Sequence, residues 1–318
     1  MNGRLGELAH RHHCVAHALS ELEPNRFGGN NFMTRGDWGR LLLLSAIWGA
    51  SFIFYRIISP VLGAVWTAET RVVLAGLVLL VFAALTKAKL EPERWRWYSL
   101  VGIINSGVPF ALIAFAQLKL TASIAAILNA TTPMWSVLLG ALFFGGRFNL
   151  FKGKGLLLGV LGVVVLVGWS PLTPSLQTTL SIAAMIGATF CYGLSSNLAK
   201  TYLQGAPPIG AAVGSQLSSS VALAFLLPFD LPRSLPNQTV LLCILGLAVV
   251  CTAVAYLLYF RLILEVGAVR ASTVTLIVPV FSMLWGTLFL GEQVTIVKVL
   301  ACLIILGGVG LINRKTEL

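Results

Sequence analysis

The stretch PMWSVLLGALFFGG at residues 133–146 returns as PVFSMLWGTLFLGE at residues 279–292. Proline, serine, two glycines and a Leu-Phe pair coincide, and the match continues without gaps over residues 133–163 and 279–309. Apolar composition alone would pair leucines and valines by chance, but it would not readily put proline, serine and glycine in register. We therefore interpret the two stretches as copies of one structural unit.

The beginnings of the two units match as well. Trp48-Gly49-Ala50-Ser51 corresponds to Tyr192-Gly193-Leu194-Ser195, and Arg56 corresponds to Lys200, at nearly the same offset. The sequence therefore predicts two related domains, residues 39–170 and residues 178–313, preceded by a tail at residues 1–38.

The composition indicates that lipid is the main solvent. Hydrophobic residues make up 57% of the chain and charged residues only 10%, whereas soluble domains carry about 25% charged residues. The net charge of +11 comes from basic residues scattered between apolar stretches rather than gathered on one domain. That pattern argues against nucleic acid as a partner and fits the excess of Lys and Arg on cytoplasmic loops of membrane proteins.

The apolar stretches reach or approach the roughly 20 residues that a membrane-spanning helix needs. They predict an all-α integral membrane protein with ten transmembrane helices, which we place at residues 39–59, 66–86, 97–118, 121–144, 153–170, 178–199, 209–229, 239–260, 267–290 and 294–313. Each unit then holds five helices. Because five is odd, the second unit must enter the membrane from the opposite face, as an inverted repeat.

The basic residues predict the orientation. Most of them fall on the side that holds the N-terminus, so we expect both termini in the cytoplasm of a bacterium, with the chain in its cytoplasmic (inner) membrane. We expect residues 1–38 to be a disordered cytoplasmic tail. All four histidines lie in it, but no acidic or cysteine residue follows at ligand spacing, so we expect neither a metal nor another cofactor. Met33 is an alternative start, which leaves open whether residues 1–32 are translated.

Several motifs resemble those of a known family. The runs Ala255-Tyr256-Leu257-Leu258-Tyr259-Phe260-Arg261, Gly267-Ala268-Val269-Arg270-Ala271-Ser272 and Phe289-Leu290-Gly291-Glu292 resemble the second half of an EamA-type member of the drug/metabolite transporter superfamily. Trp48-Gly49-Ala50-Ser51-Phe52 and Arg71 resemble its first half. The resemblance implies ten helices around a central cavity and a transporter, often an exporter of amino acids or other metabolites. Gly145-Gly146 departs from the pattern, because it lacks the glutamate of Gly291-Glu292.

Two ionisable residues lie near the start of the predicted second helix. Arg71 is a candidate for binding a substrate carboxylate or for anchoring the outer gate, and snorkelling to the membrane interface is an equal alternative. Glu69 is the only acidic residue in the predicted spans of the first half, and we consider it a candidate for proton coupling. Neutral, uncoupled or exchange transport stays open.

Pro133 and Pro279 lie in the middle of the predicted fourth and ninth helices. Each removes one backbone hydrogen bond and frees a carbonyl, that of Asn129 or Thr275. Free carbonyls at membrane depth favour a water-filled cavity, although packing kinks are the alternative. The candidate substrate-binding residues are therefore Trp48, Glu69, Arg71, Asn105, Asn129, Thr132, Pro133, Tyr192, Asn197, Tyr256, Thr275 and Pro279.

No pattern indicates an enzyme. The chain has no HExxH, GxSxG or P-loop sequence and no histidine beyond residue 17. Two inverted halves favour a carrier that alternates between inward-open and outward-open shapes, with a small polar metabolite as its substrate. A channel and a structural membrane protein are the alternatives. The substrate, the direction, the coupling ion and the choice between monomer and homodimer stay open.

Overall fold

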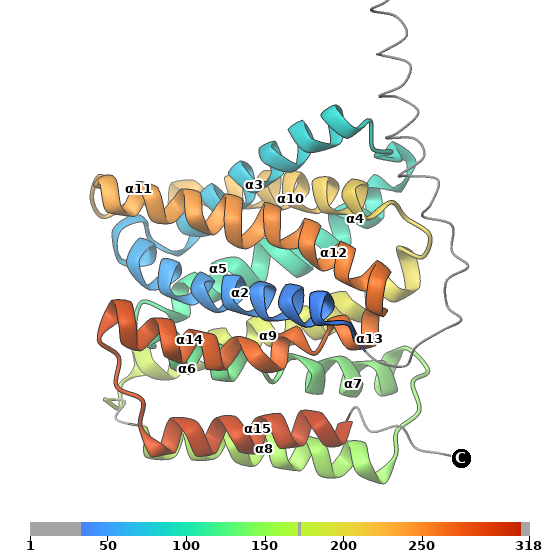
Figure 1. Ribbon diagram of the computed structural model, residues 1–318. Coiled ribbons are helices and arrows are strands. Elements are labelled where there is room, and N and C mark those ends of the chain that lie inside the picture. Colours follow the sequence, from blue (N-terminus) through green and yellow to red (C-terminus); the bar gives the residue numbers. More distant parts are fainter. Residues whose placement is uncertain (1–32, 171–172, 313–318) are drawn as a thin grey trace, which may run out of the picture. The chain divides into compact units, whose positions relative to one another are not determined.

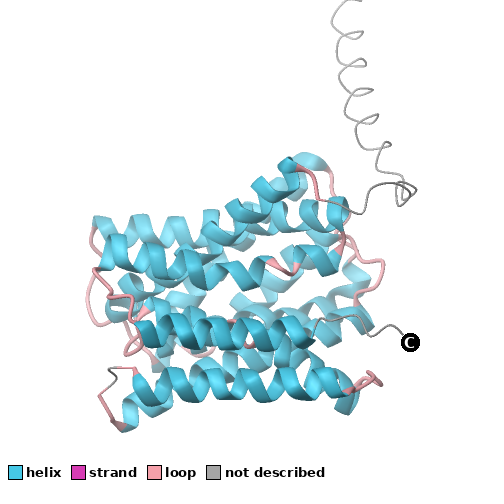
Figure 2. Ribbon diagram, turned by 60° about the horizontal axis from the view of Figure 1, so that its bottom comes forward, coloured by secondary structure: helices cyan, strands magenta, loops and turns pink. Residues whose placement is uncertain are grey.

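The computed structural model describes residues 33–170 and 173–312. All regular secondary structure in these residues is helical, as Figure 2 shows. The chain divides into two compact units, Met1–Trp38 and Gly39–Leu318. Most of the predicted tail lies outside the described residues.

Helical segments occupy each of the ten predicted ranges. In the first half they are α2 (Arg35–Leu62), α3 (Ala64–Thr86), η1 (Pro92–Arg94), α4 (Trp95–Gly102), η2 (Ile103–Gly107), α5 (Val108–Ala116), α6 (Ala122–Asn129), α7 (Thr132–Phe143) and α8 (Leu150–Trp169). In the second half they are α9 (Leu176–Tyr202), α10 (Pro208–Ala224), η3 (Leu227–Phe229), α11 (Gln238–Leu245), η4 (Gly246–Val254), α12 (Ala255–Val266), α13 (Ala268–Ala271), α14 (Val274–Leu290) and α15 (Ile296–Ile312).

Seven helices are long and apolar enough to cross a membrane when consecutive segments are joined: α2, α3, η1 to α5, α6 with α7, α8, α9, and α11 to α12. α14 and α15 are shorter apolar helices. Several boundaries differ from the predicted ones, and three of them differ by four to six residues. The first helix begins at Arg35, inside the expected tail, because Thr34 and Asp37 form a reciprocal capping box. The eighth helix continues past residue 260 to Val266 and stops at Gly267, whose φ is 84°. The seventh helix ends at Ala224 rather than at residue 229.

The repeated sequence motif forms the same local structure twice. α7 and α14 are followed by Gly145 and Gly291, whose φ angles are 67° and 64°. In each copy the amide of the next residue donates to a glycine carbonyl six residues back, Gly140 at 2.8 Å and Gly286 at 3.0 Å. Only glycine adopts this left-handed conformation without steric cost, which explains why both copies carry it.

The next helix in each half also starts alike. Asn149 caps α8 by accepting from the amide of Lys152 at 2.9 Å, and Thr295 caps α15 by accepting from the amide of Lys298 at 3.3 Å. The ammonium groups of both lysines donate to backbone carbonyls in the preceding loop. The two halves also resemble each other in their third helices, which contain the π-helical stretches η2 and η4.

Contacts between the halves are also paired. A Cβ atom on Gly49 of α2 would lie 2.8 Å from the Cβ of Phe281 of α14, and one on Gly193 of α9 would lie 2.6 Å from the Cβ of Trp135 of α7. Gly49 corresponds to Gly193, and Trp135 corresponds to Phe281, in the aligned repeats. The first helix of each half therefore packs closely against the fourth helix of the other half.

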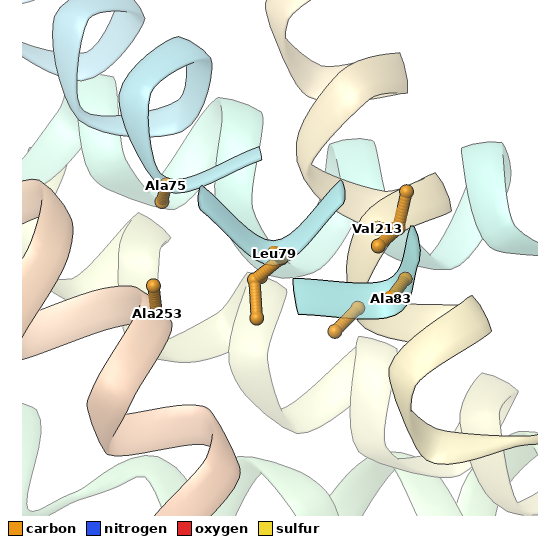
Figure 3. Close-up of a cluster of buried hydrophobic side chains, with 6 residues drawn as sticks. Ala75, Leu79, Ala83, Val213 and Ala253 are labelled. Atoms are coloured by element: carbon orange, nitrogen blue, oxygen red, sulfur yellow. The ribbon is translucent and has the colours of Figure 1, made fainter. Parts of the chain in front are cut away.

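Two further helix pairs lie at opposite edges of the second unit, and one of them packs through small side chains. α8 and α15 lie side by side at one edge of the second unit, and α3 lies against α10 at the opposite edge (Figure 1). Between α3, α10 and η4 a buried cluster is built mostly from alanine (Figure 3), which lets helix backbones approach closely. Its members are Ala75, Leu79, Ala83, Ala212, Val213 and Ala253.

Candidate functional site

A cavity of about 470 Å³ lies between the two halves. Eight of the twelve candidate residues line it, and they come from both halves: Trp48, Arg71, Asn105, Asn129, Thr132, Tyr192, Tyr256 and Thr275. Its volume is that of a site for a small organic molecule.

Arg71, in the first half of α3, is the basic residue of this lining among the described residues. Its side chain is buried, with 6% of the residue exposed. The guanidinium donates from Nε to Thr252 Oγ1 at 2.8 Å and from Nη1 to the hydroxyl of Tyr55 at 2.7 Å. The ring of Phe110 covers the guanidinium, with its centroid 3.6 Å from Cζ. Arg71 is therefore held by α2, α5 and η4 and does not snorkel to an interface.

Hydrogen bonds between polar side chains fix part of the cavity wall. Ser195 of α9 donates to Asn105 Oδ1 of η2 at 2.9 Å. Gln216 donates through Nε2 to Ser106 at 3.1 Å and to the hydroxyl of Tyr256 at 3.4 Å. These bonds orient the amide of Asn105 and the ring of Tyr256 at the cavity wall.

The lining also includes residues near the end of α9 and the start of α10 and a residue of α12. Leu203 after α9, Ala211 near the start of α10 and Phe260 in α12 belong to it. Trp48 and Tyr259 form an aromatic pair on the wall, with ring centroids 5.2 Å apart.

Only one of the two prolines lies inside a helix as predicted. The fourth helix is broken at residues 130–131, so Pro133 is the second residue of α7 rather than a mid-helix residue. The freed carbonyl of Asn129 accepts from Thr132 Oγ1 at 2.8 Å. Pro279 does lie inside α14. Neither proline lines the cavity, although Asn129, Thr132 and Thr275 do.

Glu69 and Asn197 also lie outside the cavity lining. The carboxylate of Glu69 accepts from Ser220 Oγ of α10 at 2.7 Å. Asn197 donates to the backbone carbonyls of Ser136 and Gly193, both at 2.9 Å, and so joins α9 to α7. The contacts of these two residues are between helices.

Glu292, the glutamate missing from the first copy, caps a helix of the other half. Its carboxylate accepts from the amides of Ala122 at 2.6 Å and Ser123 at 3.0 Å, at the start of α6. A carboxylate at a helix N-terminus satisfies free amides and interacts favourably with the helix dipole. Glu292 thereby joins the loop after α14 to the start of α6.

Residue types alone did not indicate Tyr55, Ser51, Phe110 and Ser195, which also line the cavity. Helical spacing contains the missing information for two of them. Ser51 and Tyr55 follow Trp48 by three and seven residues, which puts all three on one helix face.

Comparisons with known proteins agree with this architecture. The model of the EamA-like transporter family matches residues 38–168 and 179–314. An uncharacterized transporter of Archaeoglobus fulgidus is 26% identical over 87% of this chain and 99% of its own length. The uncharacterized inner membrane transporter YedA of Escherichia coli is 26% identical over 87% of this chain and 90% of its own.

Two further matches cover most of the chain. Protein PecM of Dickeya dadantii is 24% identical over 85% of this chain and 92% of its own length. One crystal structure matches with a TM-score of 0.64 at 17% identity, over 88% of this chain and 96% of the matched chain. At that identity the likeness shows the fold alone.

Proposed function

This chain belongs to the EamA-like transporter family, and on that premise we propose that it is a secondary transporter that exports small polar metabolites across the cytoplasmic membrane. The observation that carries the proposal is the cavity between the halves, which combines a buried cation, amides and aromatic rings. Such a lining can hold a solute that the lipid bilayer would exclude. The substrate reaches the cavity as a solute and leaves it chemically unchanged.

We propose that the helices in the ten predicted ranges all span the membrane, as two inverted five-helix repeats. The equivalent caps after α7 and α14 and the paired contacts at Gly49 and Gly193 support this arrangement. Two equivalent halves can exchange their shapes at nearly equal energy, and this exchange opens the cavity to each side in turn.

The distribution of Lys and Arg supports cytoplasmic termini. In that orientation the helix ends near Leu203, Ala211 and Phe260 face the cytoplasm, and Arg71 lies toward the outer side. The structure then represents an inward-facing state. An exporter loads its substrate in this state.

Reconstitution tests the carrier mechanism. Proteoliposomes are preloaded with one candidate metabolite, and uptake of the labelled compound is followed. We expect saturable uptake that rises when unlabelled compound is present inside. Flux that stays linear with concentration and shows no such stimulation would indicate a channel instead, and no flux for any exported compound would indicate a structural role.

A further inference from the structure

Resting on the transport function proposed above, we infer that the transported compound carries one carboxylate and that this carboxylate binds Arg71 in the cavity.

Arg71 has more hydrogen-bond donors than its contacts in the described residues use. An arginine side chain carries five N–H groups, and the two bonds to Thr252 and Tyr55 use one from Nε and one from Nη1. The two N–H groups of Nη2 and the second one of Nη1 have no partner among the residues that the structure describes. Arg71 is a buried residue that also lines the cavity, so these donors are available to an acceptor that enters the cavity.

Arg71 also has no anionic partner in the described part of the chain. The ion pairs there involve Arg40, Arg94 and Arg261. Glu69, two residues before Arg71, bonds to Ser220 and lies outside the cavity lining, which contains no aspartate or glutamate. A buried charge at membrane depth is costly unless it is paired. An anionic substrate supplies the missing charge when it binds.

The number of positive charges in the lining indicates which kind of anion can bind. Among the residues that the structure describes, Arg71 is the only Lys or Arg that lines the cavity, so one negative charge balances the site. A carboxylate has one charge, whereas a phosphate monoester carries close to two at neutral pH. Because Phe110 covers a face of the guanidinium, the free edge remains for the planar, two-point contact that arginine makes with carboxylates.

The side chains of the cavity wall indicate the chemistry of the rest of the substrate. Trp48, Tyr192, Tyr256 and Tyr259 present aromatic rings, and Asn105 with Ser195 presents a small polar group. No carboxylate among the described lining residues could receive an ammonium group, and Arg71 would repel a cationic compound. The substrate class is therefore an organic monocarboxylate with an apolar or aromatic body.

The substrate class can be read directly from cells. Culture medium is compared by mass spectrometry for cells with and without the protein, at equal growth. We expect the compounds whose export depends on the protein to carry one carboxylate. Exported compounds that lack a carboxylate, whether uncharged, cationic or phosphorylated, would overturn the assignment to Arg71 while the transporter proposal stands. If no compound differs between the two cultures, the proposed function itself fails.

Variants then test the residue. Arg71→Gln should lower export of these compounds at least about tenfold, since a hydrogen-bonded charge is lost, and Arg71→Lys should keep part of it. Arg56→Gln is the matched control, because Arg56 donates to the backbone carbonyls of Gln117 and Leu118 and does not line the cavity. It should export normally at equal membrane abundance. Normal export by Arg71→Gln would refute the inference.

A competition ratio separates binding from folding. In proteoliposomes, an exported acid and its primary amide compete for uptake of the labelled acid. The wild-type protein should bind the acid at least about tenfold better than the amide, and Arg71→Gln should lose this preference. An amide that competes as well as the acid in the wild-type protein would overturn the inference, even if Arg71→Gln does not fold.

Discussion

Arg71 depends on neighbours from other helices for its position. Tyr55 and Thr252 are far from it in the sequence, and each provides a hydroxyl that accepts one of its N–H groups. The sequence was enough to select Arg71, since a charge in an apolar stretch is rare, but it left snorkelling as an equal alternative. The contacts with Tyr55 and Phe110 decide against snorkelling, because they bury the guanidinium inside the protein.

The hydroxyl of Tyr55 should matter for substrate affinity. Tyr55→Phe removes the acceptor of Nη1 while it keeps the ring, so the guanidinium becomes less well oriented. A neutral hydrogen bond is worth about 1 kcal/mol and one to a charged group about 2 kcal/mol. We expect the half-saturation concentration for export to rise by about fivefold to thirtyfold, with maximal flux less affected.

Tyr98→Phe is the control for this change. The hydroxyl of Tyr98 is buried without a hydrogen-bond partner in the described residues, and it does not line the cavity. Its removal should leave the half-saturation concentration unchanged. Equal effects of the two substitutions would mean that Tyr55 acts only through packing.

At the scale of elements, the paired glycine contacts between first and fourth helices hold the two halves together. Gly193→Ala puts a Cβ atom 2.6 Å from the Cβ of Trp135 and 2.7 Å from the backbone nitrogen of Ser136, so α9 must move away from α7. Overpacking of this kind costs about 1–3 kcal/mol. We expect a lower midpoint of thermal unfolding in detergent.

Gly168→Ala provides the matched helix control. Gly168 lies in α8, and a Cβ atom there would have no atom within 4 Å. Because alanine favours helix more than glycine does, this variant should be as stable as the wild-type protein or slightly more stable. Equal destabilisation by both substitutions would contradict a role for the Gly193 contact.

The two repeated prolines should differ in effect. Pro133 is the second residue of α7, where proline is well tolerated, whereas Pro279 lies inside α14 and removes a hydrogen bond there. We therefore expect Pro279→Ala to reduce flux per protein by several-fold more than Pro133→Ala. A larger effect of Pro133→Ala would show that the break before α7 depends on the proline itself.

At the scale of the whole molecule, the proposed orientation makes the loop after α3 cytoplasmic and the loop before α9 external. In a cysteine-free background, Thr173→Cys should react with a membrane-impermeant maleimide in intact cells. Lys89→Cys should react only after the cells are opened. The reverse pattern would overturn the orientation and, with it, the inward-facing assignment of the cavity.

The helical fold could be predicted from apolar stretch length and the repeat because both are local properties. The residues at which the helices begin and end were harder to predict from the sequence. The Thr34–Asp37 capping box and the continuation of α12 to Gly267 depend on individual side chains and on one backbone angle. The break at residues 130–131 was missed because a proline predicts a disturbed helix but not on which side the helix separates.

By itself, the sequence determined that the chain is a helical membrane protein, and it predicted two related halves, because hydrophobic runs and repeated glycines are local patterns. Only the tertiary structure decided which polar residues share a cavity. Glu69 and Arg71 are two residues apart, yet one contacts α10 and the other faces the cavity. Adjacent positions on a helix face different neighbours, and those neighbours are set by the packing of helices distant in the sequence.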